Sequence, residues 1–566
     1  MAENTLSFPN ESFFRRLIEV CHKYADRILV QDGLSNSIVH YGDLLSDVAY
    51  MRQKLFQVLP ESIFDGKGII LPDAPYIFII APANYEYILA SIAVFSLGGA
   101  IAPISSGLMP EEVCHLLRKA RSRCILFSPQ YEQIGEDIAR EYSMWKQKDE
   151  YLSMIPIERS KMLCESISVE IDEDMILDPK APGMLLFSSG STGPPKGVVR
   201  PRISLQSLPP MADDGGIYLS FRPPHWISNA VGLLRVTLAA TTVKVVRDAG
   251  DAIWSELRGG QVGLFLAPPD VFAALMRHFQ ESIEPLPALE RDAFIAGVRK
   301  TPQIIVGGDV TWPTVLRFWQ ELLGRPLANA YGSSEVGVTT MTTNHVDDEG
   351  KAIHRCIGKP YLNVEVKLSE GDEGEILVKD AGMFTHYLAD AEATKAAFDD
   401  DGYFKTGDIG RKCGDEYFVD GRVSRDMLRL RGKWISAHDV EALVVSLPYI
   451  SEAYAVIASF QYRRQMSILV RAASTSTVTP TLEKIRADIQ NDLEPFKLPT
   501  MFRLLKDHEE IPYTSSGKVD RRAIVGTYFG MADELSLPGG LEFTAKDSES
   551  RWERKMWDEV ELTKWA

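Results

Sequence analysis

The sequence predicts an α/β protein, with a large N-terminal part of layered sheets and helices and a small α+β part after it. Short β-rich runs alternate with helical patterns over residues 68–128, and a second similar series runs over 217–306. Such alternation is typical of α/β layers. After residue 355 short β segments dominate, and from residue 427 a compact α+β pattern begins. We therefore expect a domain boundary near residues 421–426.

The uncharged stretch 87–107 approaches the roughly 20 residues that span a bilayer. Two glycines, Gly98 and Gly99, and then Pro103 interrupt it. We therefore expect a buried helix over 84–97 that turns into a buried strand over 100–104. The other elements expected in this series are β runs at 68–71, 76–80 and 124–128 and a helix at 110–120.

The later elements follow in order along the chain. The second series passes through 217–219, 231–241, 243–246, 263–267, 270–280 and 303–306, and β segments follow at 364–368, 374–378 and 417–419. In the α+β part we expect helices at 437–447 and 481–493 and strands at 453–457 and 466–472. Three parts are thus expected: 1–423, 424–530, and a linker with an amphipathic helix over 531–566, in which Trp552, Met556 and Val560 share one face.

Composition and charge exclude several classes of protein. The chain has 566 residues, 45% of them apolar, as in an ordinary globular protein. Its formal net charge of −17 argues against a surface built to wrap nucleic acid. Six scattered cysteines without a C-x-x-C pair indicate neither a disulfide framework nor a zinc site. The N-terminus has no apolar signal core and the C-terminus no peroxisomal address, so we expect a cytoplasmic protein without a transmembrane segment.

The strongest local signal is a loop rich in serine and glycine, directly after the apolar run 184–187. It reads Ser188-Ser189-Gly190-Ser191-Thr192-Gly193-Pro194-Pro195-Lys196. Hydroxyl groups, backbone N–H groups beside two glycines and one lysine make a cradle that suits phosphates. The spacing differs from the Walker motif, and such a loop standing alone is more often a solvated turn.

Two further segments carry groups that suit a nucleotide. Ala330-Tyr331-Gly332-Ser333-Ser334-Glu335 offers an aromatic face for a base, a hydroxyl for a phosphate oxygen and a hard carboxylate for Mg²⁺. Thr406-Gly407-Asp408 places a carboxylate in a tight turn, where it suits vicinal ribose hydroxyls. Each pattern also occurs by chance in turns, so neither is decisive alone.

The order of the motifs carries more weight than any one of them. Gly421-Arg422 follows Asp408, and Pro512-Tyr513-Thr514-Ser515-Ser516-Gly517-Lys518 stands near the end. Over roughly residues 30–530 the chain resembles the adenylate-forming superfamily of acyl-CoA synthetases, nonribosomal peptide adenylation domains and luciferases. The length of the segment 421–436 is similar to that in malonyl-CoA synthetases, and its Asp426-Met427-Leu428 looks like benzoate-CoA ligases. The resemblance implies an AMP-binding adenylation domain over 1–423 and a small mobile C-terminal domain over 424–530.

The resemblance also implies a two-step reaction. A carboxylic acid first attacks the α-phosphate of ATP and expels pyrophosphate, and a thiol, of CoA or of a phosphopantetheine arm, then attacks the acyl-adenylate. Because two anions meet in the first step, it needs charge neutralisation more than acid–base catalysis. The implied roles are phosphate binding by 188–197 with Lys196 as a catalytic group, adenine binding by Tyr331, α-phosphate binding by Ser334, Mg²⁺ binding by Glu335, and ribose binding by Asp408 and Arg422.

Two residues of the expected small domain enter this scheme. Lys518 would bridge the attacking carboxylate and the α-phosphate, and the Ser-Ser-Gly before it would let the side chain be inserted and withdrawn. The small domain would swing about 424–426 between the two steps, with the hinge at Ser424 or Arg425. In the second orientation Gly432 would line the pantetheine channel.

The acid-binding segments implied by the resemblance include one unusual residue. His225 stands where the family has a histidine beside the acyl pocket, and Gly307 and Gly308 match another segment of that pocket. A lone histidine is more often structural, but this position favours pocket lining. Asp309, where a small apolar residue is usual, would either bind a polar group of the acid or cap the following helix. No arginine directly precedes Gly307, which argues against malonate.

The acceptor of the acyl group is open at this point. The leading hypothesis is a CoA ligase, and the second is a carrier-loading adenylation protein. An inactive nucleotide-binding protein is disfavoured because both Glu335 and Lys518 are present. A cluster of basic residues suits the 3′-phosphate of CoA, unless it is only a solvated strand face. Its members are Arg425, Arg429, Arg431 and Lys433.

Overall fold

The structure is a computed structural model of the 566-residue chain. It describes residues 5–72, 75–145, 151–160, 168–188, 195–206, 216–342, 355–422, 426–430, 433–460, 463–473, 476–506, 508–514, 518–530 and 541–544. The chain forms two compact units. Unit 1 consists of Met1–Thr311, Val315–Thr406 and Arg411–Phe418, and unit 2 of Trp312–Thr314, Gly407–Gly410 and Val419–Ala566. The predicted boundary between 423 and 424 falls among residues that are not described and stays a prediction.

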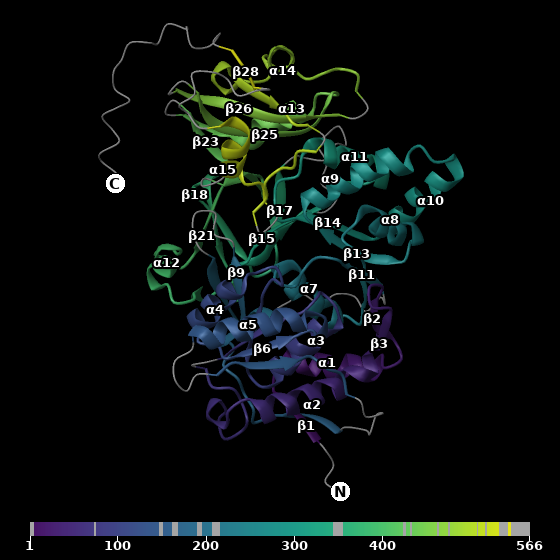
Figure 1. The fold of residues 1–566 in the computed structure, drawn as a ribbon, viewed down its shortest axis with the longest axis vertical. Helices are drawn as coiled ribbons and strands as arrows, with labels where there is room; N and C mark the ends of the chain where they lie inside the picture. Colours follow the sequence, from purple (N-terminus) through teal and green to yellow (C-terminus); the bar gives the residue numbers. More distant parts are fainter. Residues whose placement is uncertain are drawn as a thin grey trace. The chain divides into compact units, whose positions relative to one another are not determined.

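Unit 1 contains a seven-stranded sheet with a mostly parallel centre (Figure 1). In spatial order its strands are β20 (His386–Tyr387), β10 (Lys196–Pro201), β9 (Pro182–Ser188), β5 (Ala100–Pro103), β4 (Tyr76–Ile80), β6 (Cys124–Phe127) and β7 (Ser153–Pro156). Strands β9 and β10 pair antiparallel as a hairpin. This hairpin therefore joins the parallel centre of the sheet to its edge strand β20.

Helices cover both faces of this sheet, as the alternation of side chains along β4 shows. Phe78 and Ile80 pack in a core with α4 (Pro110–Lys119) and α5 (Glu132–Trp145). Ile77 and Ile79 pack in a second core with α3 (Tyr85–Ser96). Successive side chains of a strand point to opposite faces. The α/β class predicted from the sequence is thereby confirmed.

The uncharged stretch is a buried helix followed by a buried strand, as expected. Helix α3 begins after Asn84, whose side chain accepts a hydrogen bond from the N–H of Glu86 at 3.0 Å. The chain then turns at Gly98, whose φ of 74° lies in the left-handed region and where a Cβ would stand 2.6 Å from Ile69. Among the described residues, no helix has the length and hydropathy needed to cross a membrane.

The expected β run at 68–71 is wrong. Only Ile70 makes an isolated bridge there, with Phe64. Gly68, with a φ of 77°, turns the chain before a strand can form.

A thirteen-stranded sheet contains most of the remaining strands. In spatial order these are β18 (Glu365–Glu370), β19 (Glu373–Lys379), β21 (Phe404–Cys413), β22 (Glu416–Arg422), β17 (Cys356–Pro360), β16 (Gly337–Met341), β15 (Ala328–Ser333), β14 (Gln303–Gly307), β13 (Val262–Ala267), β11 (Ile217–Ser220), β12 (Thr242–Val245), β2 (Ile28–Asp32) and β3 (Ser37–His40). From β15 to β2 neighbouring strands run parallel. The second α/β series of the sequence forms this parallel part.

The helices not yet named connect or cover these strands. They are α1 (Ser12–Lys23), α2 (Tyr41–Val58), α6 (Ile203–Gln206), α7 (Ile227–Leu238), α8 (Gly250–Gly259), α9 (Pro269–His278), α10 (Ala288–Arg299), α11 (Pro313–Leu323) and α12 (Ala391–Ala396). A short parallel pair, β1 (Thr5–Pro9) with β8 (Ser168–Asp172), adds a separate small sheet.

Unit 2 has the α+β pattern that the sequence predicts. Its four-stranded sheet runs β25 (Ile450–Phe460), β26 (Arg463–Ala472), β27 (Met501–Leu504), β28 (Leu541–Phe543), and a hairpin joins β23 (Met427–Leu430) to β24 (Lys433–Ser436). The helices α13 (Ala437–Val445) and α14 (Leu482–Ile489) pack on one face, and α15 (Arg521–Ile524) packs on the other. The predicted helix over 546–562 lies outside the described residues.

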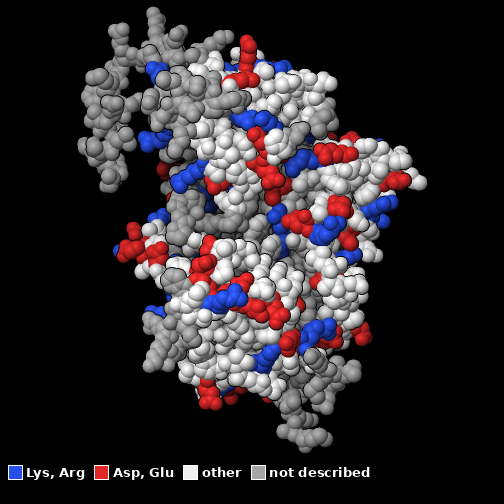
Figure 2. Space-filling model, in the orientation of Figure 1, with Lys and Arg blue, Asp and Glu red and all other residues white. Residues whose placement is uncertain are grey.

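The charges on the face drawn in Figure 2 are mixed in sign. On the face drawn in Figure 2, acidic side chains are interspersed with Lys and Arg and no broad area carries one sign alone. With the net charge of −17, this face offers nothing like the basic stripe of a nucleic-acid-binding protein.

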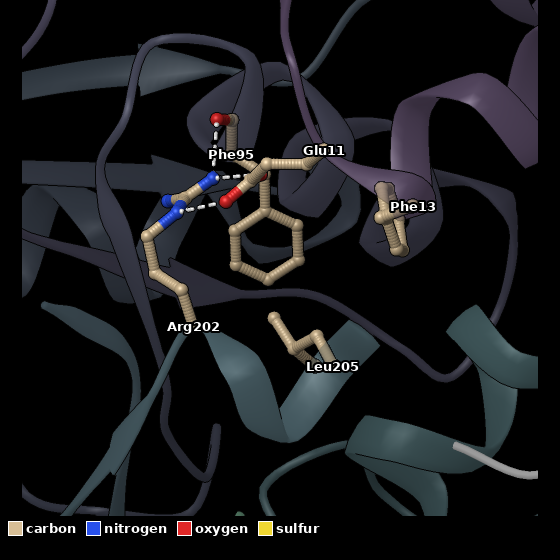
Figure 3. A pocket seen from close by; sticks show the side chains of 5 residues that line it. All are labelled: Glu11, Phe13, Phe95, Arg202 and Leu205. Atoms are coloured by element: carbon tan, nitrogen blue, oxygen red, sulfur yellow. Dashed lines mark hydrogen bonds and ion pairs between the residues drawn. The ribbon is translucent and has the colours of Figure 1, made fainter. Parts of the chain in front are cut away.

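A buried ion pair joins three segments of unit 1 (Figure 3). The guanidinium of Arg202 donates to both carboxylate oxygens of Glu11, at 2.8 and 2.7 Å, and also to the carbonyl oxygens of Gly99 and Phe95. The side chains of Arg202 and Glu11 are only 3% and 6% exposed. A small apolar cavity lined by Phe13, Phe95 and Leu205 adjoins the pair.

Removing one partner of this pair should destabilise unit 1 strongly. Arg202→Met removes the guanidinium that pairs with the buried Glu11 carboxylate, so we expect a loss of about 3–5 kcal/mol in the free energy of unfolding. Denaturant unfolding followed by tryptophan fluorescence measures it. The matched control is Glu11→Leu/Arg202→Met, which should recover most of the loss. An equal loss in both variants would contradict the charge-based explanation.

Candidate active site

The predicted phosphate loop connects the two strands of a hairpin in unit 1. Ser188 ends β9 and Lys196 begins β10, and the two residues pair directly across the hairpin. The Ser188 hydroxyl donates to the Lys196 carbonyl oxygen at 3.4 Å. The residues between them that the sequence singles out, Ser189, Gly190, Ser191, Thr192 and Gly193, lie outside the described residues. The structure thus fixes both ends of the loop.

Lys196, Tyr387 and Glu335 meet beside this hairpin. The Lys196 ammonium lies 4.9 Å from the centre of the Tyr387 ring. The Tyr387 hydroxyl donates to Glu335 Oε1 at 3.1 Å, and the Ser333 hydroxyl donates to Glu335 Oε2 at 2.9 Å. Lys196 and Glu335, two predicted catalytic residues that are distant in sequence, therefore both contact Tyr387. Each oxygen of the Glu335 carboxylate accepts a hydrogen bond from a defined donor.

Arg200, like Tyr387, is a residue of this site that was not predicted as a functional residue from the sequence. It lies in the buried part of β10 and donates from Nη1 to the carbonyl oxygens of Ser334 and Glu335, at 3.0 Å each. Its Nη2 donates to the Gly382 carbonyl oxygen at 2.9 Å. Burial lowers the pKa of Arg200 to about 10, against the opposing effect of Asp380 and Glu335. The signal was present: an arginine inside a run otherwise apolar, Gly197 to Val199, needs buried partners.

The strands β14, β15 and β16 bring the predicted adenine and acid segments together. Gly307 pairs with Ala330 in parallel register, and a Cβ on Gly307 would lie 2.5 Å from the Ala330 carbonyl oxygen. A Cβ on Gly332 would lie 1.9 Å from the Gly337 carbonyl oxygen. Only glycine permits these approaches. Tyr331 stands between them in β15, half-buried.

Asp309 does not cap the following helix. Helix α11 begins at Pro313, so the residue before the helix is Trp312 and not Asp309. Oδ1 of Asp309 accepts a hydrogen bond from the N–H of Val310 at 2.9 Å. The preceding Gly308 has a φ of 99°, and, apart from its two chain neighbours, no described residue has a heavy atom within 4 Å of the place where its Cβ would be. The capping interpretation is therefore wrong, because three residues separate Asp309 from the helix.

His225 lies in the connection between β11 and α7. Its ring packs edge-on against Trp226, with centroids 6.2 Å apart. Burial lowers the pKa of His225 to about 4, so the imidazole is neutral at physiological pH. It can therefore contact an apolar or hydrogen-bonding group, but it brings no positive charge.

Asp408 and Arg422, the predicted ribose ligands, form an ion pair in unit 2. Arg422 Nε donates to Asp408 Oδ1 at 2.7 Å and Nη2 to Oδ2 at 3.2 Å. The backbone N–H of Arg422 donates to Asp426 Oδ2 at 3.2 Å. The Asp408 side chain is 12% exposed and that of Arg422 29%. Two-point contact fixes the direction of the carboxylate.

Lys518 ends a turn of unit 2 that is closed at its base. The N–H of Thr514 donates to the Lys518 carbonyl oxygen at 2.7 Å, and the N–H of Lys518 donates to the Thr514 hydroxyl at 3.2 Å. Tyr513 and Val519 form a bridge just below. The lysine backbone is thus fixed, although residues 515–517 are not described.

The basic cluster is only partly described. Arg429 and Lys433 are exposed at the two strands of the β23–β24 hairpin, and the Lys433 ammonium lies 4.2 Å from the centre of the Phe496 ring. Arg425, Arg431 and Gly432 lie outside the described residues.

Comparison with known proteins gives the family. The model of the AMP-binding enzyme family matches residues 70–388. An acyl-CoA ligase of Aspergillus oryzae is 31% identical over 92% of this chain and 93% of its own length, and a malonate–CoA ligase of Arabidopsis thaliana is 24% identical over 90% and 88%. The o-succinylbenzoate–CoA synthetase of Bacillus subtilis, solved with its acyl-adenylate intermediate, is similar with a TM-score of 0.69 at 19% identity, over 90% of this chain and 97% of that one.

The match to the family model covers more than half of the chain, and the Aspergillus relative covers nearly all of it. The structure has the same fold as solved adenylate-forming enzymes. This chain therefore belongs to the AMP-binding enzyme family.

Proposed function

We propose that the protein is an ATP-dependent acid:CoA ligase. It activates a small-molecule carboxylic acid as an acyl-adenylate, releases pyrophosphate, and transfers the acyl group to the thiol of CoA. The observation that carries the proposal is the meeting of Lys196, Tyr387 and Glu335 at the end of the phosphate hairpin. The relatives support it, because the two that are named above are CoA ligases.

In the first step a carboxylate oxygen of the acid attacks the α-phosphorus of ATP, and the bond to the β-phosphate breaks. The hairpin loop between Ser188 and Lys196 holds the β- and γ-phosphates, and Lys196 offsets their charge. Tyr331 packs on the adenine, and the Ser334 hydroxyl donates to the α-phosphate. Asp408 accepts from the ribose hydroxyls, with Arg422 fixing its orientation.

Mg²⁺ fits the chemistry of Glu335. A hard carboxylate is the ligand that Mg²⁺ takes from proteins when phosphates of the substrate supply further oxygens. In the described part of the chain no group of three or more His, Cys, Asp or Glu side chains is placed to hold a metal ion alone. Bound Mg²⁺ would neutralise phosphate charge. Ser333 and Tyr387 hold the Glu335 carboxylate in place through their hydrogen bonds.

Lys518 is the cation that the first step needs at the reacting atoms. It reduces the repulsion between the acid's carboxylate and the α-phosphate as they approach each other. We propose that the small domain, residues 424–530, then changes orientation about residues 424–426. In the second step the thiol sulfur of CoA attacks the acyl carbon, the thiol proton is lost, and AMP leaves. Gly432 lines the pantetheine channel in that orientation.

The acid contacts His225 and the segment Gly307-Gly308-Asp309. Gly308 leaves open space where a side chain would stand, and the neutral His225 imidazole suits an apolar body or a hydroxyl. Pyrophosphate release over a panel of aliphatic, aryl, dicarboxylic and amino acids tests the function and identifies the acid class. Release with none of them would refute it.

Lys518→Ala should lower the rate of acid-dependent pyrophosphate release by about a hundredfold or more, because it removes the positive charge at the reacting atoms. Thioester formation from a pre-made acyl-adenylate should survive, since that step does not use this lysine. The control is Lys506→Ala, which removes an exposed lysine of unit 2. Equal loss of both half-reactions in Lys518→Ala would contradict the assignment.

Glu335→Gln should weaken the use of MgATP by about a hundredfold while changing the binding of AMP little, because it removes the charge and keeps the shape. Initial rates over a Mg²⁺ titration measure the effect. Tyr387→Phe is the comparison variant: it removes one hydrogen bond to Glu335 but keeps the carboxylate, so its loss should be much smaller. An unchanged Mg²⁺ dependence in Glu335→Gln would place the metal elsewhere.

Free CoA should be acylated far faster than pantetheine, and Lys433→Ala should raise the KM for CoA by roughly two- to fivefold, the size expected for an exposed charge contact. Lys497→Ala is the matched control, because Lys497 lies near the same Phe496 ring but is paired with Glu494 at 2.7 Å. Indifference to the nucleotide half of CoA, with efficient acylation of a holo carrier protein, would move the assignment to carrier loading.

A further inference from the structure

Unit 2 contains a closed ring of four buried charges that the proposed chemistry does not use. His438 Nδ1 lies 3.2 Å from Glu441 Oε2, and His438 Nε2 lies 3.5 Å from Asp426 Oδ2. Arg521 forms an ion pair with Glu441, and its Nη2 lies 3.6 Å from Asp426 Oδ1. The four side chains are between 2% and 10% exposed. Acid and base alternate around the ring, so that each charge has two neighbours of opposite sign.

The ring connects the two segments of unit 2 to which the proposed function gives roles in ATP chemistry. On one side, Asp426 accepts from the N–H of Arg422, whose guanidinium holds Asp408. On the other side, Arg521 begins α15, three residues beyond Lys518. Arg521 also donates to the Ala455 carbonyl oxygen at 2.9 Å, and Glu441 accepts from the Ala455 N–H at 2.8 Å. The Lys518 turn is thereby tied to β25, to α13 and to the segment that carries the ribose pair.

The ring is electrically balanced only while His438 is protonated. Burial opposes the charge on His438, but the carboxylates of Asp426 and Glu441 prevail and raise its pKa to about 9. Burial likewise opposes ionisation of Glu441, but Arg521 and His438 lower its pKa to about 2. Among the described residues, Tyr454 of β25 interacts with the ring through Glu441. Burial raises the pKa of Tyr454 well above its ordinary value, and Glu452, Tyr513 and Glu441 raise it further.

Stability alone is a poor reason for such a ring. Apolar side chains of similar volume usually replace a buried ion pair without loss of stability, because burying charges costs hydration. Charged groups with fixed partners differ from apolar packing in being directional, and they hold the connected segments in one geometry. Loss of the His438 proton would leave two carboxylates against one guanidinium and loosen that geometry.

We propose that Asp426, His438, Glu441 and Arg521 are positioning residues for adenylate formation, which hold the Lys518 turn in a fixed place relative to the Asp408–Arg422 pair. This inference rests on the proposed function for its kinetic consequence. None of the four touches the reacting atoms. They act chiefly through Lys518, so the half-reaction that uses Lys518 depends on them more than the thioester step does.

His438→Gln tests the ring, because it removes the charge and keeps a hydrogen-bonding side chain of similar size. With the best acid of the panel, adenylate formation should fall about tenfold, whereas thioester formation from pre-made adenylate should stay within about twofold. The double variant His438→Gln/Glu441→Gln restores the charge balance and should recover most of the rate. A structural role alone would lower both half-reactions together and would give no recovery.

The pH profile gives a second, independent measure. Since the protonated imidazole is the stabilising form, its contribution is full below about pH 6.5 and is lost as the pH rises through about 9. Wild-type adenylation, divided by the rate of thioester formation at each pH, should show this fall. In His438→Gln this ratio should be low at every pH and should not fall near pH 9, although the variant retains Lys518. A step of the same size in the variant would assign it to another group and overturn the proposal.

Limited digestion of the full chain with trypsin tests the ring without any substrate. Cleavage after Lys518, relative to cleavage after the exposed Lys433, should increase in His438→Gln and return toward the wild-type ratio in the double variant. An unchanged ratio would overturn the inference even if the enzyme ligates acids as proposed. If no acid is activated by the wild type, the proposed function fails, while this ratio still decides whether the ring fixes the turn.

Discussion

The buried guanidinium of Arg200 is the interaction on which the candidate active site depends. It binds the carbonyl oxygens of Ser334 and Glu335 with one nitrogen and that of Gly382 with the other. The same strand, β10, begins with Lys196 at the end of the phosphate hairpin. Strand β10 therefore supplies Lys196 at its exposed end. In its buried part it supplies Arg200, which anchors the turn at Ser334 and Glu335. Without the anchor, the carbonyl oxygens of that turn would lose their charged donor.

Glycine makes this arrangement possible where segments come close. Gly337, with a φ of 71°, leaves room for the Arg200 guanidinium, since a Cβ there would lie 3.3 Å from Nη2. Gly332 and Gly307 remove side chains where the backbones of neighbouring strands approach each other. These positions could be recognised in the sequence only as parts of motifs, because a glycine does not reveal which backbone it approaches.

The sequence predicted those features that are carried by local pattern. The buried helix α3 and strand β5 were predicted because an uncharged apolar run and a glycine pair coincide within about twenty residues. Helices such as α8 and α10 were missed, since their polar exposed faces weaken the apolar pattern. Among site residues, Lys196 and Glu335 followed from motifs, whereas Arg200 and the four-charge ring are defined by partners far away in the chain. Long-range pairing of this kind leaves no spacing rule in one sequence.

Buried charge has two different consequences in this protein. The Glu11–Arg202 pair adjoins apolar side chains, and its partners belong to three segments that pack together, so its effect is on the stability of unit 1. At His225, burial works the other way and removes charge, because the pKa falls to about 4 and the ring stays neutral. A neutral imidazole cannot offset the carboxylate of an incoming acid. If His225 borders the acid, it supplies no positive charge to the first step, and a second carboxylate on the substrate would find no counter-charge at this histidine.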